Sequence, residues 1–221
     1  MKHKRKVQIG DCTLYEADCT DILPHLDKVD AMLTDPPYGI ADIMVGSGHF
    51  RGLCKKMVEW DNKPPPADIF IRDFPVIAWG GTYLGLPASR GWLVWHKNNA
   101  NNSFSKAELA WSNMDFNIDV FYAPCGAPRS ERVSHPTQKP VALMKWCITH
   151  LPKDTQSILD PFMGSGTTGV ACAKMGRKFI GIELDPDCFD IACKRIEDAY
   201  KQPDMFVEPP KQEATQHDLL G

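Results

Sequence analysis

The sequence predicts an α/β fold, in which one sheet carries helices on its faces. Three observations support this prediction. Short apolar segments that suit buried strands alternate with longer segments of helical periodicity along the 221-residue chain. A glycine-rich turn at residues 164–169 lies between such a strand and the helix that follows it. The proline-rich sequence at residues 35–38 ends another strand with a rigid turn.

The first part of the chain is predicted to contain a hairpin, a short helix and several strands. Residues 7–17 alternate in polarity as a small hairpin does, and Thr20 is expected to cap a helix that ends at Leu26. Glycine, proline and polar residues fill residues 40–66, which predicts a long mobile loop. The predicted strands of this part span residues 29–33, 74–79, 91–96, 107–111 and 118–122.

The second part of the chain is predicted to alternate between helices and strands. Pro140 suits the first turn of a helix, and Gly176 suits a helix end. The predicted elements are a helix at residues 140–150, a strand at 158–159, a helix at 167–175, a strand at 179–182 and an amphipathic helix at 186–200. Residues 206–221 are rich in Pro, Glu and Gln and are expected to be disordered, which leaves residues 1–205 as one domain.

Composition narrows the function classes. Hydrophobic residues make up 43% of the chain and charged residues 24%, as in an ordinary globular domain. No apolar run approaches the roughly 20 residues of a membrane span, and no apolar stretch follows the basic N-terminus, so a cytoplasmic location is expected. The eight cysteines form no C-x-x-C pair, which predicts reduced thiols and no metal site. The net charge of −3 weakly opposes a nucleic-acid partner, although basic residues cluster at the N-terminus and within residues 51–56.

The glycine-rich turn predicts a site for a nucleotide-like cofactor. Gly164, Gly166 and Gly169 match the pattern G-x-G-x-x-G between a strand and a helix, and Glu183 ends the next strand about 17 residues after Gly166. This spacing also fits a nicotinamide dinucleotide enzyme, or a turn that only packs a helix on a strand. The motif comes late in the chain for a dinucleotide fold, and Asp160 adds an acid that suits a cationic ligand.

The turn at residues 35–38 predicts a rigid arrangement of three chemical groups. Two prolines fix two φ angles and restrict the residues before them. The turn therefore presents the carboxylate of Asp35, the carbonyl of Pro37 and the ring of Tyr38 in a fixed relation. Taken alone, it fits equally well a Pro-Pro turn that only terminates a strand.

Together, the two motifs resemble those of the beta-group amino methyltransferases of DNA, in which the catalytic motif precedes the cofactor motif. Residues 135–140, His-Pro-Thr-Gln-Lys-Pro, resemble the motif just before the cofactor strand, and residues 79–81 and 92–97 resemble later strands. Only the tail and the loop at 40–66 lack a clear match. The resemblance implies an S-adenosylmethionine-dependent methyltransferase (Rossmann-like) fold: a mostly parallel sheet, helices on both faces and a circularly permuted motif order.

The resemblance also implies the partner, the cofactor and the site residues. DNA would be the substrate and S-adenosylmethionine the cofactor, with no metal. The catalytic residues would be Asp35, Pro36, Pro37 and Tyr38. Asp18 would bind the cofactor adenine, Glu183 its ribose, and Asp35 would also lie near the cofactor. The rest of the cofactor pocket would comprise Asp160, Phe162, Gly164, Ser165 and Gly166, with Thr167, Thr168 and Lys139 as candidates for the methionine end.

The predicted chemistry is methylation of an exocyclic amino group. The lone pair of such a nitrogen is delocalised into the base, and acceptance of its hydrogens by Asp35 and the Pro37 carbonyl localises it again. The nitrogen then attacks the methyl group in line, helped by positioning and electrostatics. The base must first leave the duplex, and stacking on Tyr38 offsets part of that cost.

Several alternatives remain at this point. The Asp at the head of the motif favours N6 of adenine, whereas N4 methylation of cytosine more often resembles Ser-Pro-Pro-Tyr. An RNA or protein amine methyltransferase is a further alternative, followed by a dinucleotide-dependent oxidoreductase and a binding module. The recognition segment, near residues 97–134, has only about a dozen residues between Tyr122 and His135. We therefore expect a site of few bases, unless a second copy of the chain, as in a homodimer, adds contacts.

Overall fold

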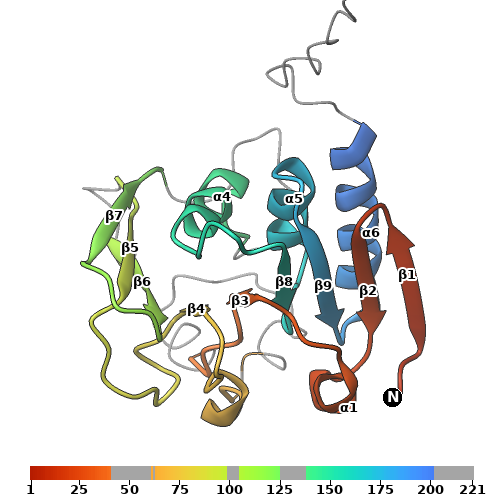
Figure 1. Ribbon diagram of the computed structural model, residues 1–221, viewed down its shortest axis with the longest axis horizontal. Helices are drawn as coiled ribbons and strands as arrows, with labels where there is room; N and C mark the ends of the chain where they lie inside the picture. Colours follow the sequence, from red (N-terminus) through yellow and green to blue (C-terminus); the bar gives the residue numbers. More distant parts are fainter. Residues whose placement is uncertain (41–60, 62, 99–104, 125–137, 202–221) are drawn as a thin grey trace, which may run out of the picture.

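The computed structural model describes residues 1–40, 61, 63–98, 105–124 and 138–201 (Figure 1). Most of the predicted loop at 40–66, much of the recognition segment near 97–134 and the predicted tail lie outside these residues. The predictions made for those segments therefore stay predictions.

Nine strands form one sheet in the order β1-β2-β9-β8-β3-β4-β6-β5-β7. Neighbouring strands pair in parallel from β2 through β9, β8 and β3 to β4, and again between β5 and β7. The pairs β1/β2, β4/β6 and β5/β6 are antiparallel, so the prediction of a mostly parallel sheet is confirmed. The strands are β1 (Arg5–Ile9), β2 (Cys12–Glu16), β3 (Ala31–Thr34), β4 (Val76–Trp79), β5 (Trp92–His96), β6 (Ala107–Ser112), β7 (Asp119–Tyr122), β8 (Ser157–Asp160) and β9 (Lys178–Glu183).

Helices cover both faces of the sheet, as predicted. Leu143, Val170 and Ile196, one from each of three longer helices, pack into one apolar core with Leu33 of the sheet. Those helices are α4 (Val141–Thr149), α5 (Thr167–Lys174) and α6 (Pro186–Lys201). The second core, on the opposite face, includes Met32 and joins α1 (Cys19–Ile22) and the 3-10 helix η2 (Ala67–Ile69); a further 3-10 turn, η1 (Leu23–His25), follows α1 (Figure 1).

The predicted elements are found with small shifts of their ends. The hairpin expected at residues 7–17 is the β1/β2 pair, and Gly176, with a φ of 62°, follows α5 as predicted. The cap of α1 is a correction: Asp18 is the N-cap, and its side chain accepts from the backbone N–H of Thr20. An Asp side chain serves a helix start as well as Thr does, and here it lies closer to the strand end. No helix in the described parts of the chain is long and apolar enough to cross a membrane.

Candidate active site

The two sequence motifs meet at the carboxyl edge of the parallel strands. Asp18 follows β2, Glu183 ends β9, Phe162 follows β8 and Asp35 follows β3, and these four strands are adjacent. From β8 the chain passes through α5 to β9 on one side, whereas from β3 it continues to β4 on the other side (Figure 1). Such a reversal of strand order is where open α/β sheets bind their ligands. The carboxyl ends of β8 and β3 are therefore the candidate site.

An acid outside the sequence motifs holds the Pro-Pro turn at residues 35–38. One carboxylate oxygen of Asp61 accepts hydrogen bonds from the backbone N–H groups of Tyr38 (2.6 Å) and Gly39 (2.7 Å). Its other oxygen accepts a hydrogen bond from the backbone N–H of Ile40 at 3.4 Å. Asp61 is only 9% exposed. Its position in a polar, proline-rich loop gave no signal for this role, because the contact spans more than 20 residues of chain.

The turn leaves one oxygen of Asp35 unoccupied. The hydroxyl of Tyr38 donates to Oδ1 of Asp35 at 2.6 Å, and Nζ of Lys139 lies 2.6 Å from the same oxygen. Oδ2 has no partner among the described residues. The ring of Tyr38 stacks on the half-exposed ring of Tyr83, with centroids 5.5 Å apart and planes 17° from parallel. The site thus combines a directed carboxylate with an aromatic surface.

Lys139 is buried and surrounded by acceptors. It is only 4% exposed, and Nζ lies 2.6 Å from Asp35, 3.1 Å from Glu108 and 3.0 Å from the Tyr38 hydroxyl. Glu108, on β6, also forms an ion pair with Lys97, at the end of β5. Burial opposes the charge on Lys139, but Asp35 and Glu108 outweigh it and raise the Lys139 pKa. The contacts of Lys139 are with protein side chains and do not test its predicted role at the methionine end of the cofactor, which stays a prediction.

Asp160 links the glycine-rich motif to the Pro-Pro turn. It is 2% exposed, and its Oδ1 accepts from the hydroxyl of Thr34 (2.7 Å) and the backbone N–H of Phe162 (3.1 Å). Its Oδ2 accepts from the hydroxyl of Thr168 (2.7 Å). Burial raises the Asp160 pKa to about 6, although these hydrogen bonds act in the opposite sense. Thr34 directly precedes Asp35, so Asp160 connects β8 and α5 to the Pro-Pro turn.

The glycine-rich turn packs tightly against α6. Gly166 has a φ of 78°, and a Cβ atom there would lie 2.9 Å from the Cβ of Ala192. Arg195 of α6 donates to the carbonyl of Ser165 (2.5 Å), to its hydroxyl (2.9 Å) and to the hydroxyl of Thr167 (3.1 Å). These two hydroxyls were predicted to bind cofactor, which stays a prediction, and no motif indicated Arg195. The contacts fix the backbone that would face a ligand.

Two carboxylates that the sequence predicts to bind the cofactor lie at the ends of β2 and β9. Glu183 accepts from the backbone N–H groups of Gly164 and Asp185, both at 2.8 Å, and burial raises its pKa to about 7. Asp18 is exposed, and Oδ1 accepts from the backbone N–H (2.9 Å) and the hydroxyl (2.7 Å) of Thr20. Its Oδ2 has no partner among the described residues. This geometry leaves Asp18 able to accept from a further donor.

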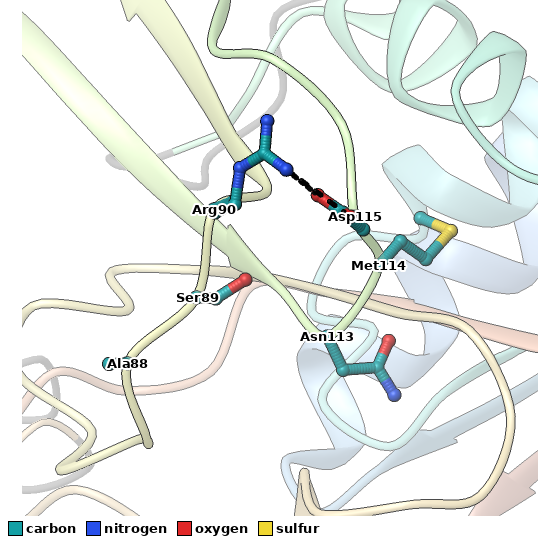
Figure 2. Close-up of a pocket in the computed structure, with 6 residues that line it drawn as sticks. All are labelled: Ala88, Ser89, Arg90, Asn113, Met114 and Asp115. Atoms are coloured by element: carbon teal, nitrogen blue, oxygen red, sulfur yellow. Dashed lines mark hydrogen bonds and ion pairs between the residues drawn. The ribbon is translucent and has the colours of Figure 1, made fainter.

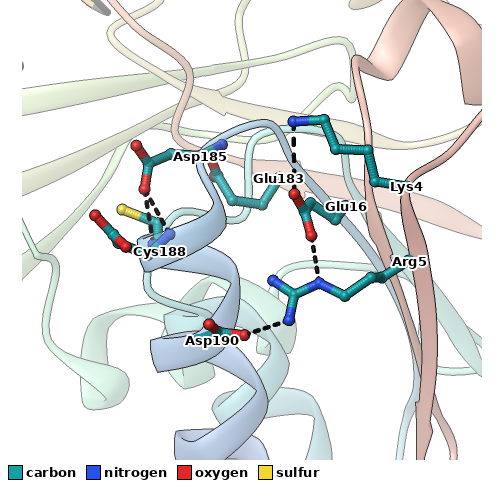
Figure 3. Close-up of polar contacts among 8 residues, drawn as sticks. Lys4, Arg5, Glu16, Glu183, Asp185, Cys188 and Asp190 are labelled. Carbon is teal, nitrogen blue, oxygen red and sulfur yellow. Dashed lines mark hydrogen bonds and ion pairs between the residues drawn. The ribbon is translucent and has the colours of Figure 1, made fainter.

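The neighbouring acid Glu16 is neutralised within the protein. It pairs with Glu183 in the β2/β9 register, but Lys4 and Arg5 both form ion pairs with it (Figure 3). Arg5 also contacts Asp190 of α6 at 2.7 Å, which joins the edge strand β1 to this helix. Glu16 is therefore paired within the protein and offers no free charge to a ligand at this end of the strands.

The described cysteines do not provide a nucleophile. Cys19 lies next to Asp18, and burial together with that charge raises its pKa to about 12. Burial also raises the pKa of Cys147, which is the cysteine whose surroundings include Lys139 and Asp35. Thiols in this state are poor nucleophiles at neutral pH, because the thiolate is the reactive form.

A surface pocket lies at the opposite edge of the sheet. It is lined by residues 88–90, before β5, and by residues 113–115, after β6 (Figure 2). Its polar groups support the fold: Asn113 donates to the carbonyl of Phe74 and accepts from the N–H of Val76. The pocket therefore lies apart from the candidate site.

Comparisons with known proteins agree with the motifs. A family model described as DNA methylase, for N6 and N4 enzymes, matches residues 92–194. The type II methyltransferase M2.DpnII of Streptococcus pneumoniae is 51% identical over 63 residues, which cover 28% of this chain and 24% of that protein. M.ScaI of Streptomyces caespitosus is 38% identical over 120 residues, which cover 52% of this chain and 38% of that protein. The chain spans less than half of the length of the curated relatives named here.

Solved structures share the fold over most of both chains. M1.HpyAVI in complex with S-adenosylmethionine has a TM-score of 0.56 and 25% sequence identity, and the match covers 84% of this chain and 98% of that one. The PvuII DNA methyltransferase, described as cytosine-N4-specific, has a TM-score of 0.57 at 14% identity. That match covers 90% of this chain and 95% of the other. The second likeness concerns the fold alone.

Proposed function

We propose that the chain is a DNA methylase of the N6/N4 kind, whose family model it matches over residues 92–194, and that it transfers a methyl group from S-adenosylmethionine to N6 of adenine in DNA. The observation that carries this proposal is the Oδ2 atom of Asp35, which has no partner within the described parts of the chain. Oδ1 is held by Tyr38 and Lys139, so Oδ2 and the carbonyl of Pro37 are the acceptors that the turn offers to a substrate.

The cofactor edge suits S-adenosylmethionine better than a dinucleotide. Carboxylates of Asp18, Asp35 and Glu183 lie at the carboxyl ends of adjacent strands, and the ammonium of Lys139 is already shared between two acids. A pyrophosphate would face these negative charges, whereas a sulfonium and an ammonium are attracted by them. The N–H groups at the turn after β8, together with Glu183, suit the ribose end. When bound, the cofactor supplies a methyl group on a positively charged sulfur.

The residues of the turn would then act on the nitrogen of the base. Oδ2 of Asp35 accepts one amino hydrogen and the Pro37 carbonyl accepts the other, which frees the nitrogen lone pair. The nitrogen–carbon bond forms as the carbon–sulfur bond breaks, and the proton lost from nitrogen passes to Oδ2 and then to water. Tyr38 provides the stacking surface for the displaced base, once the exposed ring of Tyr83 moves aside.

Nucleoside analysis tests this function. Plasmid DNA is incubated with the protein and labelled S-adenosylmethionine, digested and separated by mass spectrometry. We expect labelled N6-methyladenine from the wild-type protein and none from Asp35→Asn, which still binds S-adenosylhomocysteine in calorimetry. N4-methylcytosine as the sole product would show that the target base is cytosine and not adenine. Label in RNA or protein, with none in DNA, would overturn it.

A further inference from the structure

Four buried or partly buried charges form a chain behind the catalytic turn. Asp35, Lys139, Glu108 and Lys97 alternate in sign and come from four separate parts of the fold: the end of β3, the segment before α4, β6 and the end of β5. We call these four residues the charge chain. Two of them, Glu108 and Lys97, have no part in the function proposed above.

The charge chain is a costly arrangement for stability alone. Lys139 is 4% exposed, and the ring of the fully buried Trp79 lies 5.4 Å from its Nζ. Burial of an ammonium is unfavourable unless acceptors compensate it, and an apolar side chain often fills such a place with equal or greater stability. Here each of the three ammonium protons has one acceptor: Asp35, Glu108 and the Tyr38 hydroxyl. A charged residue at this position therefore calls for a role beyond packing.

That role follows from which oxygen the ammonium contacts. Lys139 contacts Oδ1 of Asp35, the oxygen that also accepts from the Tyr38 hydroxyl. With both donors on Oδ1, the carboxylate cannot rotate without loss of two charge-assisted hydrogen bonds. Oδ2 then remains directed away from the charge chain.

We propose that Lys139 and Glu108 are positioning residues: Glu108 holds the ammonium of Lys139, and Lys139 fixes Asp35 so that Oδ2, and not Oδ1, accepts one hydrogen of the target amine. This inference rests on the proposed methyl transfer. Lys97 completes the chain, because its ion pair with Glu108 leaves the four residues without net charge. Burial opposes the charge on Glu108, but Lys139 and Lys97 outweigh it and lower its pKa to about 2, so Glu108 stays ionised at neutral pH.

The charge chain predicts the direction in which the pH dependence of kcat changes when Lys139 is replaced. In Lys139→Met, the carboxylates of Asp35 and Glu108 face each other without the cation, so the pair retains a proton to higher pH. A protonated Asp35 is a weaker acceptor for the amine hydrogen. The acidic fall-off of kcat therefore moves to higher pH in Lys139→Met. In the double variant Lys139→Met/Glu108→Gln the repulsion is gone, and the fall-off moves back toward that of the wild type. The other titratable groups around these two carboxylates are present in every variant; they are Tyr38, Asp61, Lys97, Cys147 and Asp160.

The experiment measures kcat from pH 5 to pH 9 and S-adenosylhomocysteine affinity for the wild type and the three variants Lys139→Met, Glu108→Gln and the double. At neutral pH we expect a loss in kcat of about 100-fold for Lys139→Met and about tenfold for Glu108→Gln, the scale of a misplaced catalytic group, with cofactor affinity nearly unchanged. Arg90→Met is the matched control. It removes one partner of an ion pair at the opposite edge of the sheet, in which both side chains are 73% exposed, and it should leave kcat unchanged.

The outcomes separate this inference from the proposed function. If the wild-type protein methylates no DNA, the proposed function fails first. If the wild type is active and the variants fold, bind cofactor and turn over like Arg90→Met, Lys139 and Glu108 are structural and the inference is wrong. The inference is also wrong if the acidic fall-off of Lys139→Met does not move, or if Glu108→Gln does not reverse its shift. A variant that fails to fold is replaced by Lys139→Arg, which keeps the charge and should keep the wild-type pH profile.

Discussion

The pKa of Glu183 makes the binding of cofactor depend on pH in a calculable way. Burial raises this pKa to about 7, from 4.5 for a free Glu side chain. If Glu183 accepts hydrogens from the ribose hydroxyls, as we propose, the ionised form binds better. At pH 5.5 a group with a pKa near 7 is only about 3% ionised, against about 90% at pH 8, so S-adenosylhomocysteine should bind roughly 30-fold more weakly at pH 5.5.

Isothermal titration calorimetry measures this effect in two independent ways. Affinity should fall by up to about tenfold per unit below pH 7. The observed enthalpy at pH 6 should also depend on the ionisation enthalpy of the buffer, because Glu183 must release a proton when the ligand binds. Glu183→Gln should bind weakly with little pH dependence. Asp18→Asn is the matched control, since it removes a carboxylate from the same edge but should retain the wild-type pH dependence. An affinity of the wild-type protein that stays constant from pH 8 to pH 5.5, with no proton release, would refute the role of Glu183.

Three further predictions concern the contacts around the turn and the choice of sequence. Asp61→Ala removes the acceptor for the N–H groups of Tyr38 and Gly39, so we expect kcat to fall by about tenfold or more in single-turnover assays, whereas Asp61→Asn keeps an acceptor oxygen and most of the activity. Equal activity of the two variants would contradict this. Thr34→Val removes one donor to the buried Asp160 and should lower the free energy of unfolding by about 1–3 kcal/mol in urea titrations; a value near zero would show that the link is not a stabilising one. Long-read sequencing of treated DNA should reveal a site of few bases, and a stringent site of six or more base pairs methylated by a monomer would exclude it.

The local features of the fold were accessible from the sequence. Strands such as β3 and β8 are short apolar runs, and the ends of α5 follow from glycines beside it, because periodicity and turn conformation depend on neighbouring residues. The same holds for the motifs at residues 35–38 and 160–166, whose glycines and prolines determine their own backbone. Only small differences appeared, such as the cap of α1, where two adjacent polar side chains compete for one helix start.

The tertiary structure decided which residues support those motifs. Asp61 and Arg195 contact the two turns from positions about 23 and 30 residues away in the chain, and Lys139 lies 101 residues from Tyr38. No periodic pattern marks such contacts, since each depends on the order of strands and on the packing of helices between them.

The sequence by itself determined the two chemical motifs, their order and the class of sheet that carries them. Only the tertiary structure placed Glu108 of β6 within reach of Lys139 and so connected a strand with no motif to Asp35. It also showed that the carboxylate of Asp160 accepts hydrogen bonds from the hydroxyls of Thr34 and Thr168. The physical reason is the range of the interactions: backbone preference acts between neighbours in the chain, whereas buried charges and hydrogen bonds are satisfied by whatever the completed fold brings near them.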